Sequence, residues 1–246
     1  MVDPKNDIEE RMHQIATLLL ANQKGTSDWG DLSHLEGQPC SKRIANKFLI
    51  CCLLDWQMNS DLAWRNGYRL VEGILGDPDD VWKAITSVSE NEWTSRRGQY
   101  KLHRFPACHM RLWAIAWRIC DTYDGDARRI WEGKKASDVF RRLSDLGSGE
   151  QLSRMIVGAL RDCGQITGAS DVKADVHVCR VLGRAVTGDP TDAETAVQLA
   201  RQLHLADPWQ LDWPLWNVGK SYCHPLNQDC PQCYLAPHCA HALGVK

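Results

Sequence analysis

Apolar residues recur at helical spacing along most of the chain. They do so from Ile8 to Leu20, and the segment from Lys42 to Trp56 opens with basic residues and then becomes strongly apolar. Because apolar residues at i, i+3, i+4 and i+7 form one face of a helix, we predict a helix over each segment, the second one central and buried. The polar, glycine-containing stretch 22–38 is expected to be a loop.

Several predicted helices carry their own start signals. Ser89 and Thr191 are each followed three residues later by a glutamate, the pattern of a capping box, and Asp77 precedes a proline and two further acids. A longer helix is predicted over 106–123, ending near Gly125 and burying one face formed by Met110, Trp113, Trp117 and Cys120. No segment shows a series of alternating strands, so the predicted fold class is all-α.

Composition narrows the class of protein. The chain has 246 residues, of which 43% are hydrophobic and 24% charged, so it can bury the core of one large domain or two small ones. No apolar run is long enough to cross a membrane, and the acidic, polar N-terminus is unlike a signal peptide. Eleven cysteines without an export signal are expected to be reduced thiols. We therefore predict a cytoplasmic protein, associated with the nucleoid if its source is a prokaryote.

The charge distribution bears on possible partners. A formal net charge of −2 does not favour binding to nucleic acid, so any contact with DNA has to come from a local patch. One such patch lies between Arg96 and Arg118, where six basic residues and four aromatic residues occur without a single acid. Two interpretations remain open: a solvated basic face with extended side chains, or a phosphate-binding surface.

Four cysteines gather near the C-terminus, with six, two and five residues between them: Cys223, Cys230, Cys233 and Cys239. Four thiolates on so short a segment suit a tetrahedral zinc site or a [4Fe–4S] cluster, and spacing alone favours neither. The third interpretation is a set of ordinary buried cysteines without a metal.

Two further segments have the residue types of a reactive site. Gly147 and Gly149 precede a predicted helix, where a sharp turn would leave backbone N–H groups directed at a phosphate oxygen, or simply join two helices. Asp175 precedes the helical pattern of Val178, Val181 and Leu182, at the position of an N-cap. It is either a capping residue alone or a carboxylate that also takes part in catalysis.

Together these segments resemble the endonuclease III branch of the helix-hairpin-helix DNA glycosylases. The stretch from Trp216 through Gly219-Lys220 to the four cysteines is similar to the iron–sulfur loop of that family. The segment 143–151 resembles its hairpin without the usual proline, 173–177 resembles its Val-Asp-Thr-His segment, and 53–60 resembles its Leu-Leu-Ser-x-Gln-x-Thr segment. The resemblance spans nearly the whole chain in the same order.

The resemblance implies a fold and a partner. It predicts two helical domains that flank a DNA-binding cleft: a six-helix barrel with the hairpin over 41–175, and a domain with the [4Fe–4S] loop formed by 1–40 and 176–246. The partner is double-stranded DNA, the chain is expected to be a monomer, and no membrane is involved.

It also implies roles for individual residues. Asp175 is the expected catalytic carboxylate, and the four cysteines are the expected cluster ligands. The expected DNA contacts are Gln57, Gly147, Gly149, Lys101 and Lys220. The residues expected near the pocket for the extruded base are Trp56, Trp64 and His109.

The expected activity is base-excision repair, in which the N-glycosidic bond of a damaged or mismatched base is cleaved. Bifunctional members of the family carry a lysine nucleophile just after the hairpin, and the same offset lands here on Gln151. A monofunctional glycosylase is therefore predicted, and a bifunctional enzyme that uses Lys173 is the alternative. Two further hypotheses are a non-catalytic iron–sulfur module that binds DNA and a zinc-stabilised interaction protein.

Overall fold

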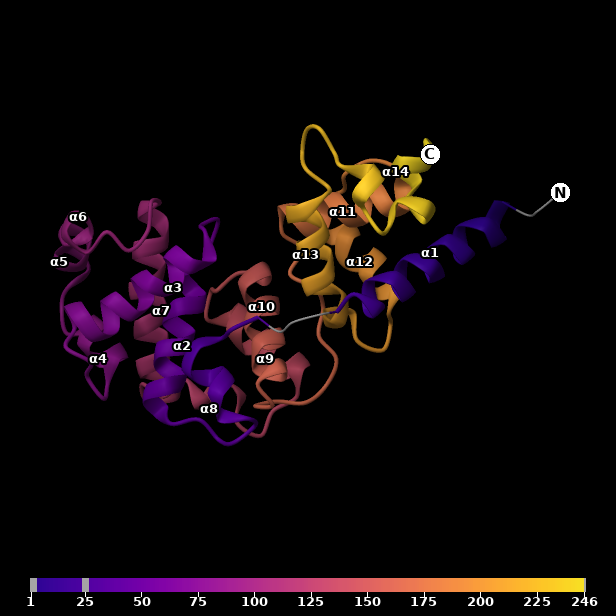
Figure 1. The fold of residues 1–246 in the computed structure, drawn as a ribbon. Helices are drawn as coiled ribbons and strands as arrows, with labels where there is room; N and C mark the ends of the chain where they lie inside the picture. The colour runs from indigo at the N-terminus through magenta and orange to yellow at the C-terminus, as the bar shows by residue number, and fades with distance from the viewer. Residues whose placement is uncertain (1–3, 24–26, 246) are drawn as a thin grey trace. The chain divides into compact units, whose positions relative to one another are not determined.

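The structure is a computed structural model that describes residues 4–23 and 27–245. Among these residues every regular element is a helix, and the single β-type contact is an isolated bridge between Lys135 and Thr167 (Figure 1). The prediction of an all-α fold is confirmed. No helix in this part of the chain combines the length and the apolar character needed to cross a membrane.

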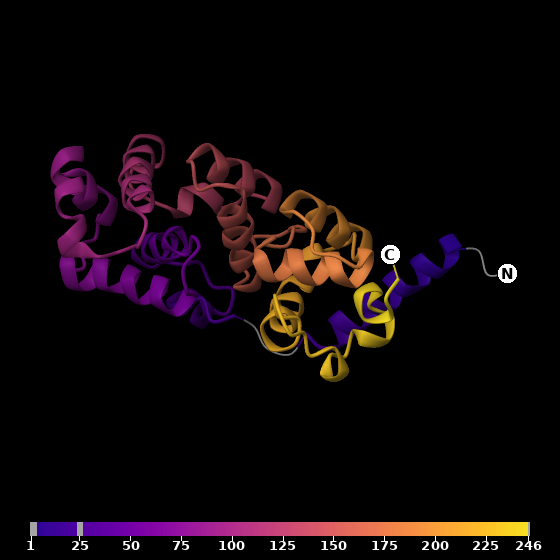
Figure 2. The same ribbon diagram turned by 90° about the horizontal axis from the view of Figure 1, so that it is seen from above.

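The chain divides into two compact units. One consists of residues 28–168, and the other joins both ends of the chain, residues 1–27 and 169–246, as the indigo and yellow segments of Figure 2 show. The sequence suggested the same interleaved order with boundaries after residues 40 and 175, and those domain limits stay a prediction.

Unit 28–168 is arranged around helix α2. Its elements are η1 (Gly30–Leu35), α2 (Lys42–Leu54), α3 (Ser60–Tyr68), η2 (Arg69–Ile74), α4 (Val81–Thr86), α5 (Glu90–Ser95), α6 (Arg97–Tyr100), α7 (Pro106–Tyr123), α8 (Arg128–Trp131), α9 (Ala136–Asp145) and α10 (Glu150–Asp162). The Ser41 hydroxyl caps α2 by accepting from Ile44 N, and every residue from 45 to 54 is buried. Buried Asn46 donates to the Gly125 carbonyl at 3.0 Å and accepts from Ala127 N at 2.9 Å. These bonds explain how a polar side chain fits in a central helix.

Three local predictions differ from the structure. Helix α4 begins at Val81 rather than after Asp77, which adopts a left-handed backbone conformation instead of a cap. Helix α12 (Ala193–Leu203) is capped by Asp192, one residue after the predicted position. Helix α7 has the predicted bounds but buries another face, which contains Leu112, Ile115 and Ile119, while Trp117 is 47% exposed. The three errors share one cause, because neighbouring residues offered nearly equivalent local patterns and tertiary packing selected between them.

The other unit is arranged around helix α11 (Val176–Thr187). Its remaining elements are α1 (Pro4–Ala21), α12, η3 (Pro208–Leu211), α13 (Asp212–Ser221), η4 (Cys230–Gln232), η5 (Ala236–His238) and α14 (Ala240–Leu243). Helix α11 contacts α1, α12, α13 and α14, and its apolar side supplies Val178, Val181 and Leu182 to the core. The approach to α13 is close: a Cβ built on Gly219 would lie 2.7 Å from the Cβ of His177.

This close approach predicts the effect of a single methyl group. We expect Gly219→Ala to destabilise the protein by about 1–3 kcal/mol, because the added atom has to push α11 and α13 apart. Chemical denaturation measures the change. Gly98→Ala is the matched control, since a Cβ there meets no atom within 4 Å; an equal loss in both variants would contradict the packing argument.

Candidate functional site

Helices α9 and α10 form a helical hairpin joined by residues 146–149. Gly147 and Gly149 have φ values of 87° and 81°, which favour glycine because other residues rarely adopt them. A Cβ on Gly147 would lie 2.6 Å from Nη1 of Arg118, the atom that donates to the Leu146 carbonyl at 2.7 Å. Gly149 has open space around it and is the N-cap of α10. The sequence therefore located this turn correctly, but it gave no sign that Arg118, part of the basic segment, contacts the turn.

Two serines fix the hairpin from inside. The Ser148 hydroxyl is buried, donates to the Leu143 carbonyl at 2.9 Å and lies 2.6 Å from the Ser153 hydroxyl. Gln151, which the resemblance predicts to stand in place of the lysine of bifunctional members, lies half-buried in the first turn of α10. Its Oε1 atom is buried and has no hydrogen-bond partner among the described residues. Helix α10 contains no lysine at all.

Asp175 caps helix α11. Its Oδ1 accepts from the backbone N–H groups of His177 at 2.8 Å and Val178 at 3.0 Å. The other carboxylate oxygen, Oδ2, accepts no hydrogen bond from the part of the chain that the structure describes. A helix N-terminus stabilises negative charge, so the site suits a carboxylate. Lys173 precedes it by two residues, and the backbone N–H of Lys173 donates to Asp212 at 2.6 Å.

The same helix holds the start of the cysteine segment through two arginines. Arg180 donates to the carbonyls of Cys223 at 2.6 Å and Gly219 at 2.8 Å, and it also lies 3.0 Å from Nδ1 of His177. Arg184 donates to the His224 carbonyl at 2.7 Å and to the Cys223 sulfur at 3.4 Å. Both side chains are buried. Neither arginine had an expected role, although their four-residue spacing places them on one side of α11.

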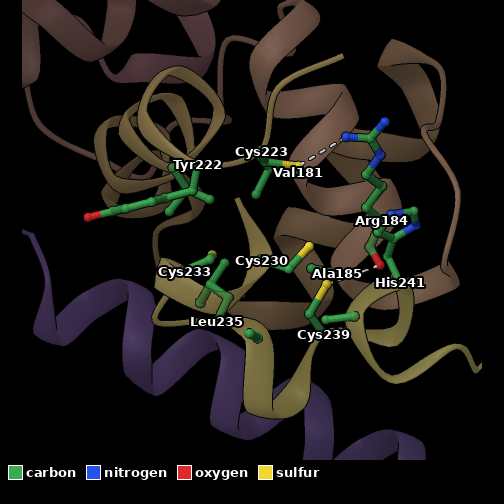
Figure 3. A pocket seen from close by; sticks show the side chains of 13 residues that line it. Val181, Arg184, Ala185, Tyr222, Cys223, Cys230, Cys233, Leu235, Cys239 and His241 are labelled. Atoms are coloured by element: carbon green, nitrogen blue, oxygen red, sulfur yellow. Dashed lines mark hydrogen bonds between the residues drawn. The ribbon is translucent and has the colours of Figure 1, made fainter. Parts of the chain in front are cut away.

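The four cysteines line one cavity of about 30 Å³ (Figure 3). Apolar residues of α11 and the C-terminal segment close it, among them Val181, Ala185 and Leu235. The Arg184 side chain lies on its wall, and the buried Nε of Arg184 has no hydrogen-bond partner among the described residues. All four thiols are half-buried and none forms a disulfide.

These residues fit an iron–sulfur cluster. Burial raises the pKa of the Cys233 thiol to about 11 and also raises that of Cys239, so both thiols are neutral unless a metal displaces the protons. The guanidinium of Arg184 supplies positive charge beside the thiolates that a metal would create. In the described residues, no three histidine, cysteine, aspartate or glutamate side chains lie close enough to hold a single metal ion. The four cysteine side chains that line the cavity are a donor set that either a [4Fe–4S] cluster or a tetrahedral zinc site could use.

Lys220, expected to contact DNA, is exposed near the end of α13. Its ammonium lies 4.5 Å from the ring centroid of Trp216, which in turn packs edge-on against His177. Trp213 stacks on Trp216 with ring centroids 5.3 Å apart. The His177 ring therefore contacts the ring that Lys220 covers, while the His177 backbone N–H donates to Asp175.

Gln57 and Trp56 follow the C-terminal end of α2 in a short loop. Gln57 is exposed in a left-handed conformation with a φ of 50°, and its carbonyl accepts from the Arg104 guanidinium. Trp56 is half-buried: its ring stacks on His103 with centroids 6.1 Å apart, and the Arg111 guanidinium lies 5.0 Å from its centroid.

Two of the residues expected near the base pocket have other surroundings. His109 is fully buried, stacks on Trp93 at 4.7 Å and lies 2.8 Å from the Trp93 carbonyl through Nε2. It belongs to the core, and we correct its assignment to the pocket. Trp64 is half-buried in an aromatic cluster with Trp29, Phe48 and Tyr68.

Comparison with known proteins identifies the fold. No protein-family model matches the sequence, and no curated protein does. Solved structures match over nearly the whole chain. A trapped endonuclease III–DNA covalent intermediate, the estranged-adenine complex, has 14% identity and a TM-score of 0.64 over 99% of both chains. A non-covalent endonuclease III–DNA complex has 15% identity and a TM-score of 0.62, over 99% of this chain and 98% of that one.

A third structure, a thermostable thymine-DNA glycosylase, has 13% identity and a TM-score of 0.63 over 98% of this chain and all of the other. The chain therefore has the all-α fold of the helix-hairpin-helix DNA glycosylases. This confirms the resemblance found in the sequence at the level of the fold.

The capping geometry of Asp175 can be tested separately from any activity. We expect Asp175→Ala to lower the free energy of unfolding by about 1 kcal/mol, because the N–H groups of His177 and Val178 lose their acceptor. Asp175→Asn keeps a carbonyl oxygen at that position and should be nearly neutral. Denaturation curves of both variants check this; equal loss in both would mean that the charge, rather than the cap, stabilises α11.

Proposed function

We propose that the protein is a DNA glycosylase that cleaves the N-glycosidic bond of a damaged or mismatched base in duplex DNA. The observation that carries the proposal is Asp175, a carboxylate fixed by two backbone N–H groups through one oxygen while the other oxygen accepts none from the described residues. The fold supports it, because the chain is similar over nearly its full length to two endonuclease III–DNA complexes and to a thymine-DNA glycosylase.

The proposed reaction uses Asp175 in two ways. As the glycosidic bond breaks, its electron pair leaves with the base and positive charge develops on the sugar, which the carboxylate stabilises. A water molecule then forms the new bond to the sugar carbon and gives up a proton, for which Asp175 is the acceptor; the departing base takes up a proton from solvent, and Asp175 afterwards returns its proton to solvent. The products are a base and an abasic site in an intact strand.

Other residues are proposed to hold the DNA. The open backbone at Gly149, where α10 begins, suits a phosphate oxygen because the first N–H groups of a helix lack internal partners. Lys220 offers a cation for another phosphate of the DNA backbone. Gln57 is exposed on a fixed loop, which suits insertion into the duplex when a base is extruded, with Trp56 at its side.

We propose a monofunctional enzyme because Gln151 cannot form a Schiff base, and because α10 offers no lysine in its place. Lys173 is the alternative nucleophile, since it lies two residues from Asp175. The base that is removed stays open: mismatched thymine or uracil, or an alkylated or oxidised base.

We further propose a [4Fe–4S] cluster held by Cys223, Cys230, Cys233 and Cys239. When bound, it would act as a cross-link that fixes the C-terminal loop, and it takes no part in the proposed reaction. Arg180 and Arg184 would hold the first cysteine in place by their bonds to its carbonyl and its sulfur. Through Gly219 and Lys220, this loop is continuous with the proposed DNA-binding side of α13.

The activity can be tested on duplexes that each contain one mismatched or damaged base. We expect strand breaks only after treatment with hot alkali, which would show base release without strand cleavage and name the substrate. Asp175→Asn should lower single-turnover cleavage by about a hundredfold or more, because it removes the charge and the proton acceptor but keeps the cap. Full activity of this variant would remove Asp175 from the proposed chemistry.

Breaks without alkali would instead indicate lyase activity. Borohydride would then trap a covalent adduct, and loss of that adduct in Lys173→Ala would assign the nucleophile. Duplex binding without cleavage of any base in the panel would favour the non-catalytic binding module.

The cluster is tested by metal and sulfide analysis of the purified protein. We expect about four irons and four acid-labile sulfides per chain, and a brown colour that is lost in Cys230→Ser. Cys120→Ser is the matched control, since this half-buried thiol lies on α7, outside the loop. A colourless protein that contains zinc, and neither iron nor sulfide, would contradict the cluster and favour the zinc-stabilised interaction protein.

A further inference from the structure

A basic hollow lies on unit 28–168, built from residues other than Asp175 and the cysteines. It is an open hollow of about 440 Å³ lined by five residues of one short segment: Arg97, Gly98, Lys101, His103 and Arg104. Arg97, Lys101 and Arg104 are all exposed. Gly98 adds no side chain, and a Cβ there would meet nothing within 4 Å, so the backbone at this position is accessible from the hollow.

The turn that forms the hollow is fixed by the neighbouring helices. Lys101 has a φ of 46°, a conformation that costs a residue with a side chain about 1 kcal/mol or more and therefore needs support. The guanidinium of Arg69 provides support by donating to the carbonyls of Tyr100 and Lys101. Asn66 adds a bond of 2.9 Å to the Leu102 carbonyl. The three cations are thus mounted on a turn that side chains of α3 and η2 restrain.

The hollow is positively charged, and no acidic side chain in its lining neutralises that charge. No acid lines it, and Glu92, which precedes the segment, is paired with Arg96. The side chains of Arg97 and Lys101 have no ion-pair or hydrogen-bond partner among the described residues. Of the basic residues between 96 and 118, Arg111 and Arg118 instead donate to carbonyls of the hairpin. Arg111 and Arg118 thus serve the hairpin, and both interpretations of the basic segment stay open for Arg97, Lys101 and Arg104.

His103 contributes a neutral wall. Its Nδ1 accepts from Phe105 N at 3.0 Å, so Nε2 carries the ring proton and donates to the Trp56 carbonyl at 2.8 Å. Burial lowers the pKa of His103, with Arg111 and Arg104 adding to the effect. Both ring nitrogens are engaged inside the protein, so the ligand contacts fall to the three cations.

Arg104 joins the hollow to the loop that carries Gln57. Its guanidinium donates to the Gln57 carbonyl and lies 4.7 Å from the ring centroid of Phe105. A guanidinium has five N–H donors, so it can hold this carbonyl and still bind an anion in the hollow. Together with the hydrogen bond from His103 to the Trp56 carbonyl, two hydrogen bonds connect the hollow to the loop that carries Trp56 and Gln57.

We propose that this hollow binds one phosphate group of the DNA backbone and so sets the position of the duplex relative to Gln57. The proposal rests on the proposed function in that it takes DNA as the partner, but it does not require base excision. A phosphate is the ligand that Lys and Arg donors on one turn, without an acid beside them, select.

The test is binding of an undamaged duplex by Arg97→Ala/Lys101→Ala. We expect about ten- to hundredfold weaker binding, because two charge-assisted contacts are lost. The slope of log affinity against log salt should become shallower by about 1, the contribution of one phosphate. Lys134→Ala/Lys135→Ala removes the same charge from exposed positions before α9 and should bind within about twofold of the wild type.

A second measurement locates the phosphate. Duplexes are made with one neutral methylphosphonate at a time, so that each removes a single backbone charge. We expect one position whose neutralisation weakens the wild type but has no further effect on Arg97→Ala/Lys101→Ala. If no position shows this coupling, or if the double variant binds like the wild type with the same salt slope, the proposal is wrong.

Inorganic phosphate separates a free anion from the DNA backbone. At matched ionic strength, we expect it to give the wild type and the double variant the same shift in melting temperature. Selective stabilisation of the wild type, together with unchanged duplex binding by the double variant, would assign the hollow to free phosphate and overturn the proposal. Because none of these measurements uses a damaged base, failure here is distinguishable from absence of glycosylase activity.

Discussion

Two buried guanidinium groups on α11 are the constraint on which the C-terminal part of the structure depends. Burying an arginine is costly unless its N–H groups find acceptors, and here backbone carbonyls of 219–225 accept from both side chains, while Nε of Arg184 has no partner among the described residues. Arg180 and Arg184 therefore fix where α13 ends and where the cysteine segment begins. Because Asp175 caps the same helix, its carboxylate and the first cysteine are held by one rigid element.

The hairpin of α9 and α10 depends on something else: two positions of its turn need residues without a side chain. Gly147 leaves room for the Arg118 guanidinium that satisfies the Leu146 carbonyl, while Gly149 leaves room on the outside. Gly147 is thus required by a contact inside the protein, whereas Gly149 keeps the outer surface of the turn open. A proline is absent from this turn, and the buried bonds of Ser148 to Leu143 and Ser153 restrain it in another way.

The sequence predicted those features that depend on local chemistry. The all-α fold, the bounds of α7, the cap at Asp175 and the glycine turn follow from periodicity, capping and backbone freedom, which need only neighbouring residues. The resemblance added the overall fold. His109 was misplaced because an imidazole in an amphipathic helix carries no local sign of which face is buried, and its stacking on Trp93 comes from another helix. Arg180 and Arg184 were missed because their partners lie about forty residues away.

The net charge of the chain and the charge near the basic hollow lead to different expectations about DNA binding. A formal net charge of −2 describes the whole molecule, whereas a phosphate responds to fields within about a Debye length, roughly 10 Å at moderate salt. Within that range, what matters is which cations are left unneutralised. The segment 96–118 has six basic residues, but Arg96 is paired with Glu92, and Arg111 and Arg118 donate to hairpin carbonyls. Counting basic residues therefore overstates the donors that are open to a phosphate: among the described residues Arg97 and Lys101 have no partner, and Arg104 uses only part of its guanidinium on the Gln57 carbonyl.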